Sequence, residues 1–514
     1  MKPPFENRID WPFFLRVGLL LVATLLLRLS ELGYSDFQGD EIKALCRPAE
    51  GQNIGGFLLG QRKGPIQFLI TCLYGVVDPA YSSELAVRLP FATASIFAVV
   101  VFYILADQLF GRSVAVYAAL FLATNGLFVA LGRIVQYQSI TILFMLIALY
   151  SFTKAAQDQR WKISGLYLGA IAAAIGILGH FDGVYALPPM VYLLYIWWKR
   201  YRAAPSFHLY RNHLLVAGGL FAALLLTFYL PYVLQLNNYP LDYWRERITG
   251  ARSSTWQLFR FYNPGPIIWA YVLLIVLGLF RLRRDLASGF LMIWLLPPLI
   301  FNEFVIRESH THIYTYLLPL FLFCALGIET IRLSLERLFK GSSRRLVQAL
   351  SLLLFGFLTF LSYEILVDHN PEYPWQPKTV LSLELVGGDM SGTFGFPYSR
   401  QWNEIGGWFT QNTGSAAVVA TNEKPTIALF YLPSTMRVED EEINQEYLKK
   451  LNDGDRIAAL LIESPQSWRE TFWGLSLEEW RNTEEPVRVF RDQSGRLRAS
   501  VYYLTKERFQ ELLQ

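Results

Sequence analysis

The residues of this sequence that are best suited to chemistry lie between Tyr34 and Lys43, directly after the first long apolar run. Three carboxylates, Asp36, Asp40 and Glu41, fall within six positions there. Carboxylates beside a membrane are costly to keep unless they pair or react. An aspartate near cations stays ionised and can accept a proton from a hydroxyl. The stretch is therefore a candidate active-site loop, with Asp40 and Glu41 as catalytic residues. Helix capping explains the same pair, and Asp36 is typical of a turn.

Further candidates occur in the polar segments between later apolar runs. They are basic, imidazole and phenol side chains, joined by one more carboxylate, and they suit a substrate with an anionic head and a lipid tail. Lysine and arginine are natural ligands of a phosphate. Each also has a structural interpretation, because cations anchor helices at a membrane interface and buried polar groups bond to helix ends. The predicted substrate-binding residues are Arg62, Lys63, Arg88, Arg133, Tyr137, His180, Asp182, His310 and His312.

Composition favours a membrane protein. The chain has 514 residues, of which 53% are apolar and 17% charged, whereas soluble domains are about a quarter charged. Its net charge is only +4, with the basic residues in short clusters, which is not a nucleic-acid footprint. The phosphate-loop, CxxC-pair and HExxH motifs of common soluble enzymes are absent. The three cysteines, Cys46, Cys72 and Cys324, predict no disulfide framework.

Eleven apolar runs in the first 366 residues are candidates to cross a membrane about 30 Å thick. The first run is too long for a signal-peptide core and is expected to stay as an anchor. The pattern predicts a mainly α, polytopic helical bundle. The runs are 11–30, 88–109, 114–131, 138–153, 163–180, 184–198, 214–232, 266–280, 286–304, 313–331 and 346–366.

Lysine and arginine predict the orientation of this bundle. They are concentrated in the loops 110–113, 154–162, 199–213, 281–285 and 332–345, which are therefore expected in the cytoplasm together with the N-terminus. The apolar segment 64–77 is short and fits an interfacial helix better than a span. If it crossed the membrane, Asp40 would face the side opposite to the other polar loops. As an interfacial helix, it leaves all the candidate residues at the extracytoplasmic surface.

The composition changes near Asp368, where Pro, Gly, acidic residues and Trp become common and no further apolar run follows. Residues 416–421, 456–462 and 497–504 read as short buried strands, and 399–410 and 506–513 as helices. We therefore expect two domains, a transmembrane domain at 1–366 and an extracytoplasmic soluble α/β domain at 367–514.

The order of these motifs resembles the GT-C glycosyltransferases of the protein O-mannosyltransferase and aminoarabinose-transferase type. The acidic pair follows the first span, and a basic residue then precedes a Pro-containing interfacial helix. The resemblance covers roughly the first 330 residues. It rests on the segments Lys63-Gly-Pro-Ile-Gln-Phe, Val87-Arg-Leu-Pro-Phe-Ala-Thr-Ala, Leu109-Phe-Gly-Arg and His310-Thr-His-Ile-Tyr-Thr-Tyr-Leu-Leu-Pro.

The resemblance implies a cell-membrane enzyme that moves a sugar from a polyprenyl phosphate to an extracytoplasmic hydroxyl acceptor, usually with inversion. The position of the family's catalytic acid is Asp40, with Glu41 beside it. Arg62 stands where the aminoarabinose branch has an acidic residue that can bind metal. No metal ligand is therefore assigned, although a divalent metal stays open as a cofactor. Two alternatives are a polytopic transporter or flippase, which would favour repeats and mid-membrane polar groups, and a non-catalytic subunit of cell-envelope assembly.

Overall fold

The computed structural model describes residues 11–512 except 62, 206, 236–237, 251–254, 308–309, 340–342, 386–392, 413–417, 440–455, 468 and 470. The chain forms two compact units. The first unit contains Met1–Leu32, Cys46–Tyr81 and Ala86–Asp368, and the second contains Gly33–Leu45, Ser82–Leu85 and His369–Gln514. The acidic stretch after the first apolar run thus folds with the C-terminal residues, which no sequence pattern indicated.

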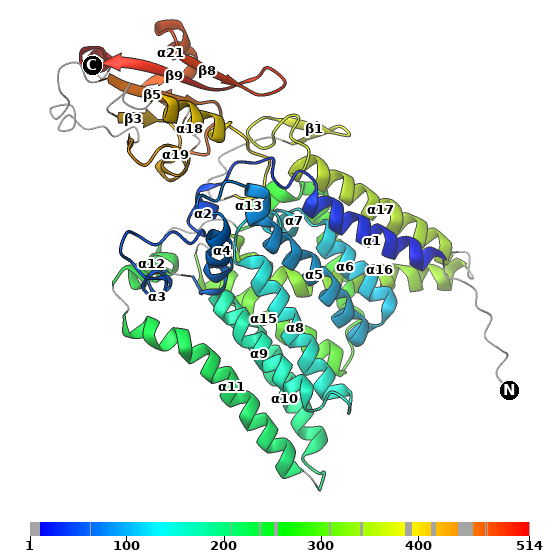
Figure 1. Ribbon diagram of the computed structural model, residues 1–514. Coiled ribbons are helices and arrows are strands. Elements are labelled where there is room, and N and C mark those ends of the chain that lie inside the picture. The colour runs from blue at the N-terminus through cyan, green and yellow to red at the C-terminus, as the bar shows by residue number, and fades with distance from the viewer. Residues whose placement is uncertain are drawn as a thin grey trace. The chain divides into compact units, whose positions relative to one another are not determined.

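Helices dominate the first unit (Figure 1), and every apolar run expected to span the membrane falls on helical segments. The run 114–131 is divided at Asn125, whose side chain accepts a hydrogen bond from the Leu127 amide at 3.1 Å and so begins a new helix. The long helices are α1 (Trp11–Leu29), α5 (Glu84–Phe110), α6 (Arg112–Thr124), α7 (Gly126–Leu131), α8 (Gln138–Gln157), α9 (Ser164–Gly179), α10 (Leu187–Tyr201), α11 (Phe207–Leu234), α14 (Gly265–Leu279), α15 (Leu286–Ile300), α16 (Tyr314–Phe339) and α17 (Ser343–Leu366).

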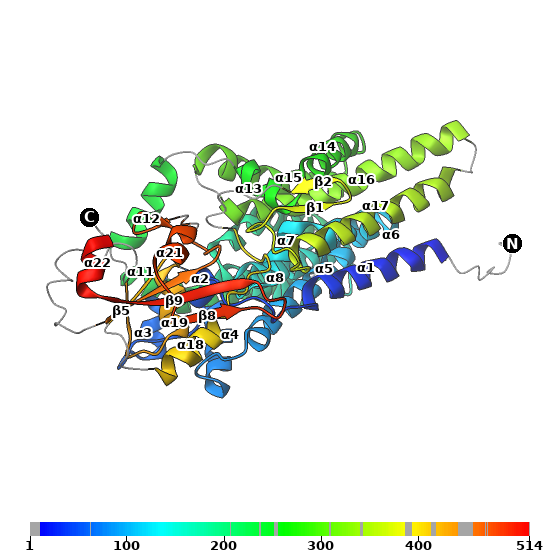
Figure 2. The same cartoon turned by 90° about the horizontal axis from the view of Figure 1, so that it is seen from above.

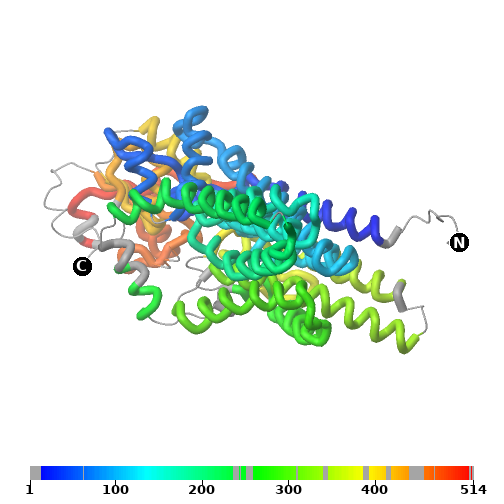
Figure 3. The backbone as a smooth tube through the Cα atoms, turned by 90° about the horizontal axis from the view of Figure 1, so that it is seen from below, coloured from blue at the N-terminus to red at the C-terminus, as the bar shows by residue number. Residues whose placement is uncertain are grey.

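Within the described residues, 6 helices are long and apolar enough to cross a membrane. They are Glu84–Phe110, Gln138–Gln157, Phe207–Leu234, Leu286–Val305, Thr311–Phe339 and Arg345–Leu366. Large apolar side chains such as Leu226, Val233 and Trp269 are exposed on the surface of the bundle, as lipid contact requires. Helices α16 and α17 pack side by side (Figures 2 and 3). The predicted multi-pass helical architecture is confirmed.

Shorter helices occupy the polar connections. They are α2 (Gly39–Ile42), α3 (Ile54–Leu59), α4 (Ile66–Val77), α12 (Asn238–Thr249), α13 (Thr255–Tyr262), the 3-10 turns η1 (Phe181–Ala186) and η3 (His310–Ile313), and the π turn η2 (Phe301–Val305). Helix α4 has 12 residues and is about 18 Å long, which is too short to cross a bilayer. Its length favours the interfacial placement.

A disulfide between Cys46 and Cys72 ties the segment after α2 to α4. The expectation of no disulfide framework is therefore wrong for this pair. The two cysteines are 26 residues apart, and only the return of α4 toward the preceding loop brings their Cα atoms within 4.9 Å. Gly64 packs where a Cβ atom would lie 2.0 Å from the Leu178 carbonyl oxygen. Glycine is therefore required where the start of α4 meets the end of α9.

The second unit contains a five-stranded sheet in the order β4-β3-β5-β9-β8. Strand β3 is parallel to β4 and β5, whereas β9 is antiparallel to β5 and β8. Apolar residues of β3, β5 and β9 pack with three aromatic side chains, Phe472, Trp473 and Trp480, in its core. The strands are β3 (Val418–Thr421), β4 (Arg437–Glu439), β5 (Arg456–Ile462), β8 (Arg488–Arg491) and β9 (Leu497–Thr505).

Helices α18 (Trp402–Gln411), α19 (Pro425–Tyr431), α21 (Leu477–Thr483) and α22 (Lys506–Leu512) and two small hairpins complete this unit. The hairpins pair β1 (Lys378–Val380) with β2 (Leu383–Leu385) and β6 (Thr471–Phe472) with β7 (Leu475–Ser476). The three strands and two helices expected from the sequence correspond to β3, β5, β9, α18 and α22. Residues 416 and 417 of the first expected strand lie outside the described residues. The α/β character of this region is confirmed.

Candidate active site

A buried polar cluster in the first unit joins segments that are far apart in the sequence. His180 ends α9, Asp182 lies on η1, His312 lies on η3, and Tyr314 begins α16. The Asp182 Oδ2 atom is 2.6 Å from His312 Nδ1 and 3.3 Å from His180 Nδ1. The Tyr314 hydroxyl donates to the same oxygen at 2.9 Å. Two imidazoles and a phenol thus surround one carboxylate oxygen.

His180 has a lone pair on the nitrogen that faces this carboxylate. Its Nδ1 accepts the backbone N–H of Asp182 at 3.2 Å, so that nitrogen carries no hydrogen. The His180 side chain is buried, with 2% of the residue exposed. The ring of Tyr137 stacks on it with centroids 3.8 Å apart. A neutral imidazole held in this way is a hydrogen-bond acceptor or a metal ligand.

Lys63 supplies a cation at the same cluster. Its Nζ donates to Gln136 Oε1 at 2.9 Å and lies 5.2 Å from the centroid of the Tyr137 ring. The close contact of Gly64 with α9 brings Lys63 to this position. The structure therefore brings together Lys63, Tyr137, His180, Asp182 and His312, five of the predicted substrate-binding residues. Gln136 was missed, and its only signal in the sequence is its place beside Tyr137 in a polar turn.

The same cluster has the donor set of a metal site. One ligand atom each from His180, Asp182 and His312 lie within 4.8 Å of one another. Two imidazole nitrogens and a carboxylate oxygen are common ligands of zinc and other divalent ions. These residues therefore fit a divalent metal. This site differs from that of the aminoarabinose branch, whose acidic residue is replaced here by Arg62. In the absence of an ion, His312 and Tyr314 hydrogen-bond to Asp182 Oδ2, and His180 is held by the backbone N–H of Asp182.

Two other predicted residues, Arg88 and Arg133, bind the carboxyl end of α1. Arg133 Nη1 donates to the carbonyl oxygens of Leu27 and Ser30 at 3.0 and 2.8 Å. Arg88 Nη1 donates to the Leu32 carbonyl oxygen at 3.1 Å. A cation at the C-terminus of a helix is favoured by the helix dipole. These contacts favour the anchoring interpretation over a phosphate clamp. Arg62 and the side chain of His310 lie outside the described residues.

In the second unit, the two acids of α2 have different environments. Glu41 is fully buried, and its Oε2 accepts the backbone N–H of Gln38 at 3.0 Å, which caps the helix. The side chain of Asp40 is 39% exposed and lies 3.6 Å from Lys43 Nζ. Asp40 is therefore the carboxylate that a substrate can reach, while Glu41 holds the helix that carries it.

Asp36 is buried and structural. Its Oδ2 accepts the backbone N–H of Arg400 at 2.5 Å, and its own N–H donates to the Tyr398 carbonyl oxygen at 2.9 Å. Burial raises the pKa of Asp36 to about 7. These bonds join the acidic stretch to the C-terminal residues of the same unit.

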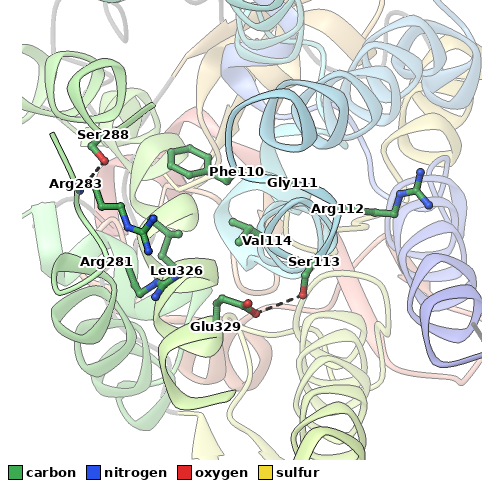
Figure 4. A pocket seen from close by; sticks show the side chains of 10 residues that line it. All are labelled: Phe110, Gly111, Arg112, Ser113, Val114, Arg281, Arg283, Ser288, Leu326 and Glu329. Atoms are coloured by element: carbon green, nitrogen blue, oxygen red, sulfur yellow. Dashed lines mark hydrogen bonds between the residues drawn. The ribbon is translucent and has the colours of Figure 1, made fainter. Parts of the chain in front are cut away.

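A cavity of about 310 Å³ lies elsewhere in the first unit, where α5 meets α6 (Figure 4). It adjoins Phe110, whereas Arg88 lies near the other end of α5, about 33 Å away along the helix. Arg112, Arg281, Arg283 and Glu329 are among the residues that line it. These arginines belong to the loops 110–113 and 281–285, which the sequence predicts to be cytoplasmic. The residues that line the cavity do not include those of the buried polar cluster.

Known proteins resemble this chain over part of its length. Residues 66–227 match the family model described as dolichyl-phosphate-mannose-protein mannosyltransferase. An undecaprenyl phosphate-alpha-4-amino-4-deoxy-L-arabinose arabinosyl transferase of Pseudomonas fluorescens is 27% identical over 248 residues. This match covers 45% of the chain and 42% of that relative, which is less than half of its length.

Solved structures share the fold. ArnT from Cupriavidus metallidurans bound to undecaprenyl phosphate has a TM-score of 0.58 at 14% identity, covering 96% of this chain and 98% of that one. The arabinofuranosyltransferase AftD from Mycobacteria has a TM-score of 0.52 at 14% identity, covering 97% and 40%. The archaeal oligosaccharyltransferase AglB from Archaeoglobus fulgidus has a TM-score of 0.50 at 12% identity, covering 96% and 74%.

The resemblance to the GT-C membrane glycosyltransferases is confirmed by these matches. At identities this low, the solved structures show the fold alone. The family model matches only residues 66–227, which is less than half of the chain. The matched region 66–227 contains Gln136, Tyr137, His180 and Asp182, which supply much of the polar cluster.

Proposed function

We propose that the protein is an integral membrane glycosyltransferase that moves a glycosyl unit from a polyprenyl-phosphate sugar to an extracytoplasmic hydroxyl acceptor on a protein, lipid or glycan. The observation that carries the proposal is the cluster of Lys63, Tyr137, His180, Asp182 and His312. Most of it lies in the region that matches a lipid-phosphate sugar transferase family. Two of the solved relatives also hold a polyprenyl phosphate, undecaprenyl phosphate in one and dolichol-phosphate in the other.

The proposed reaction is a single displacement. Asp40 accepts the proton of the acceptor hydroxyl, whose oxygen attacks the anomeric carbon. The bond between that carbon and the phosphate oxygen breaks with inversion, and polyprenyl phosphate leaves. Lys63 neutralises the phosphate, while His180, Asp182 and His312 bind polar groups of the donor. Glu41 supports Asp40 by capping α2. A divalent ion held by the two histidines and Asp182 would add charge neutralisation at the same place.

The disulfide supports the proposed location. Disulfides persist in oxidising compartments and are rare in the cytosol. Cys46 and Cys72 flank the segment from the acidic stretch to α4, so this segment is expected outside the cytoplasm. The distribution of lysine and arginine favours the same arrangement, with a cytoplasmic N-terminus and an extracytoplasmic C-terminal domain. We infer that the protein resides in the plasma membrane.

The test is a transfer assay with the full-length protein in detergent and a panel of radiolabelled polyprenyl-phosphate sugars. Asp40→Asn should lower the release of polyprenyl phosphate about 100-fold or more, because the variant lacks the base. Glu50→Gln, which alters an exposed carboxylate nearby, is the matched control and should keep full activity. Full activity of folded Asp40→Asn would disprove the role of Asp40. No release with any donor would instead favour the transporter or the assembly subunit.

A further inference from the structure

The sheet of the second unit has a topological switch point between β3 and β5. These strands are parallel neighbours. After β3 the chain continues to β4 on one side of the pair, and after β5 it continues to β8 and β9 on the other side. In open α/β sheets, the crevice at the carboxyl ends of two such strands is the usual place for a ligand. Here the residues that follow the two strands are Asn422–Lys424 and Glu463–Ser467.

The chain's own acidic stretch binds at this place. The backbone N–H of Gly39 donates to Gln466 Oε1 at 3.1 Å, and both residues are buried. A Cβ atom on Gly39 would lie 3.9 Å from Lys424 Cδ, so the lysine side chain packs against the residue before Asp40. Helix α19 also contacts α2. The loops after β3 and β5 thus hold α2 where other α/β domains hold a ligand.

A second contact fixes the start of the stretch. The backbone N–H of Phe37 donates to the Tyr431 hydroxyl at 2.7 Å, and that hydroxyl donates to Glu84 Oε1 at 3.0 Å. Tyr431 is the last residue of α19, the helix that begins after Lys424. Together with the bond to Gln466, this contact holds two backbone amides of the stretch by side chains of the C-terminal region.

Gln466 is itself held in place. Its backbone N–H is 2.9 Å from Glu423 Oε2 and 3.1 Å from the Tyr398 hydroxyl. The Tyr398 hydroxyl donates to the same glutamate, which is fully buried. Gln466 is thus bonded through its backbone to Glu423 and Tyr398, and through its side chain to Gly39. It therefore fixes the position of α2 relative to the sheet. A side-chain amide this constrained is suited to positioning a catalytic group.

Lys424 brings a charge to the same position. The ammonium lies in the field of two carboxylates, Glu423 and Asp40, and of one cation, Lys43. The side chain is partly buried. Its ammonium therefore attracts the Asp40 carboxylate electrostatically.

We propose that Gln466 and Lys424 are positioning residues for Asp40, so that the C-terminal domain is part of the catalytic apparatus. Gln466 fixes the backbone directly before Asp40, and the side chain of Lys424 packs against the same residue, Gly39. The proposal rests on the proposed function, because it takes Asp40 as the base. A displacement of a catalytic group by about 1 Å can cost about a hundredfold in rate.

The experiment compares Gln466→Met, which keeps the size of the side chain but lacks the acceptor oxygen, with Lys424→Met and Lys424→Arg. Gln411→Met, at an exposed glutamine of α18, is the matched control. For each full-length variant, hydrogen–deuterium exchange is followed in peptides covering residues 36–42, and kcat and KM for the donor are measured separately. Thermal unfolding of each variant confirms that it is folded.

We expect Gln466→Met to speed exchange at Gly39 and to lower kcat about tenfold to a hundredfold, with KM for the donor unchanged. Lys424→Met should lower kcat about tenfold, and Lys424→Arg should restore most of it. Wild-type exchange and kcat in both Met variants would overturn the proposal. Faster exchange with unchanged kcat would also overturn it, because the contact would then be structural only. If no donor supports transfer, the proposed function fails, while unchanged exchange in Gln466→Met would separately refute the contact.

Discussion

Two buried polar groups in this protein differ in how their charges are balanced. In the second unit, Glu372 is fully buried between two guanidinium groups, at 2.5 Å from Arg400 Nη1 and 2.7 Å from Arg498 Nη1, and it accepts a bond from the Tyr34 hydroxyl at 2.8 Å. Burial raises the pKa of Glu372, but the two arginines outweigh it, so the pKa is lowered. Arg498 Nη2 also lies 2.9 Å from Asp492 Oδ2, so each charge has a counter-charge. In the first unit, the hydrogen-bond partners of the Asp182 carboxylate within the described residues are an imidazole and a phenol.

This difference distinguishes a network that stabilises the fold from a cluster that can bind a ligand. The charges around Glu372 are balanced within the protein, so their interactions stabilise the folded state. The cluster of the first unit has two imidazoles beside one carboxylate and a lysine at its edge, which suit a metal ion or a phosphate. We therefore expect substitutions at Glu372 to change stability, and substitutions in the cluster to change activity.

The largest effect is expected for Glu372→Gln. The substitution leaves Arg400 and Arg498 buried without their carboxylate, and breaking a buried ion pair in this way costs about 3–5 kcal/mol in the free energy of unfolding. Thermal unfolding in detergent measures the loss. Glu484→Gln removes the partly exposed partner of Arg508 and should cost less than about 1 kcal/mol. Equal effects of the two variants would mean that the network around Glu372 is not a major source of stability.

The disulfide of the first unit should rank next. Cys46→Ser opens a loop with a sequence separation of 26, and loss of a native disulfide of this size costs about 3 kcal/mol. Cys324→Ser, which changes the buried cysteine without a disulfide partner, is the control. Unfolding is measured with and without a reductant. The reductant should lower the stability of the wild type and of Cys324→Ser, but not that of Cys46→Ser. A wild-type protein that is insensitive to reductant, with both thiols free by mass spectrometry, would contradict the pairing.

A smaller effect in free energy is expected for His312→Ala, and it should appear in activity. Loss of one group that orients a site typically lowers activity about 10- to 100-fold, equivalent to about 1.4–2.7 kcal/mol. The melting temperature should change little. His213→Ala, at a histidine bonded to Tyr167 outside the cluster, is the control. A variant that loses stability but keeps its activity per folded molecule would make the cluster a structural network like that around Glu372. The zinc content of the same samples shows whether the imidazoles hold an ion.

The sequence was sufficient to predict the helices and much of the cluster. Membrane helices are continuous apolar runs, so their positions follow from composition alone. His180, Asp182 and His312 could be selected because polar residues at the ends of such runs need partners. The break at Asn125 was missed, because an asparagine that starts a helix is not distinguished from one inside a long apolar run.

The long-range contacts of the second unit could not be predicted. Gly39 bonds to Gln466, and Asp36 bonds to Arg400, across separations of 427 and 364 residues. Periodicity and local motifs report on neighbours within a helix or strand, and they carry no information on such pairs. For the same reason, Arg133 could not be assigned to the carbonyl groups of α1 rather than to a phosphate.

The smallest effect is expected at Asp36. It tests whether this buried structural carboxyl group makes the free energy of unfolding depend on pH. Burial raises its pKa in the folded protein to about 7, whereas the unfolded chain titrates near 3.9. Between these values the folded state binds more protons than the unfolded state, so the free energy of unfolding falls as pH rises and levels off above the folded pKa. From pH 6 to pH 8 the wild type should lose about 1 kcal/mol relative to Asp36→Asn, whose amide oxygen can still accept the Arg400 N–H. Melting temperatures of both proteins at the two pH values measure this difference, and Asp242→Asn, at an exposed position, should behave like the wild type. A pH dependence that is equal in Asp36→Asn and the wild type would mean that this carboxyl group is ionised in the folded protein, with Arg400 as its counter-charge.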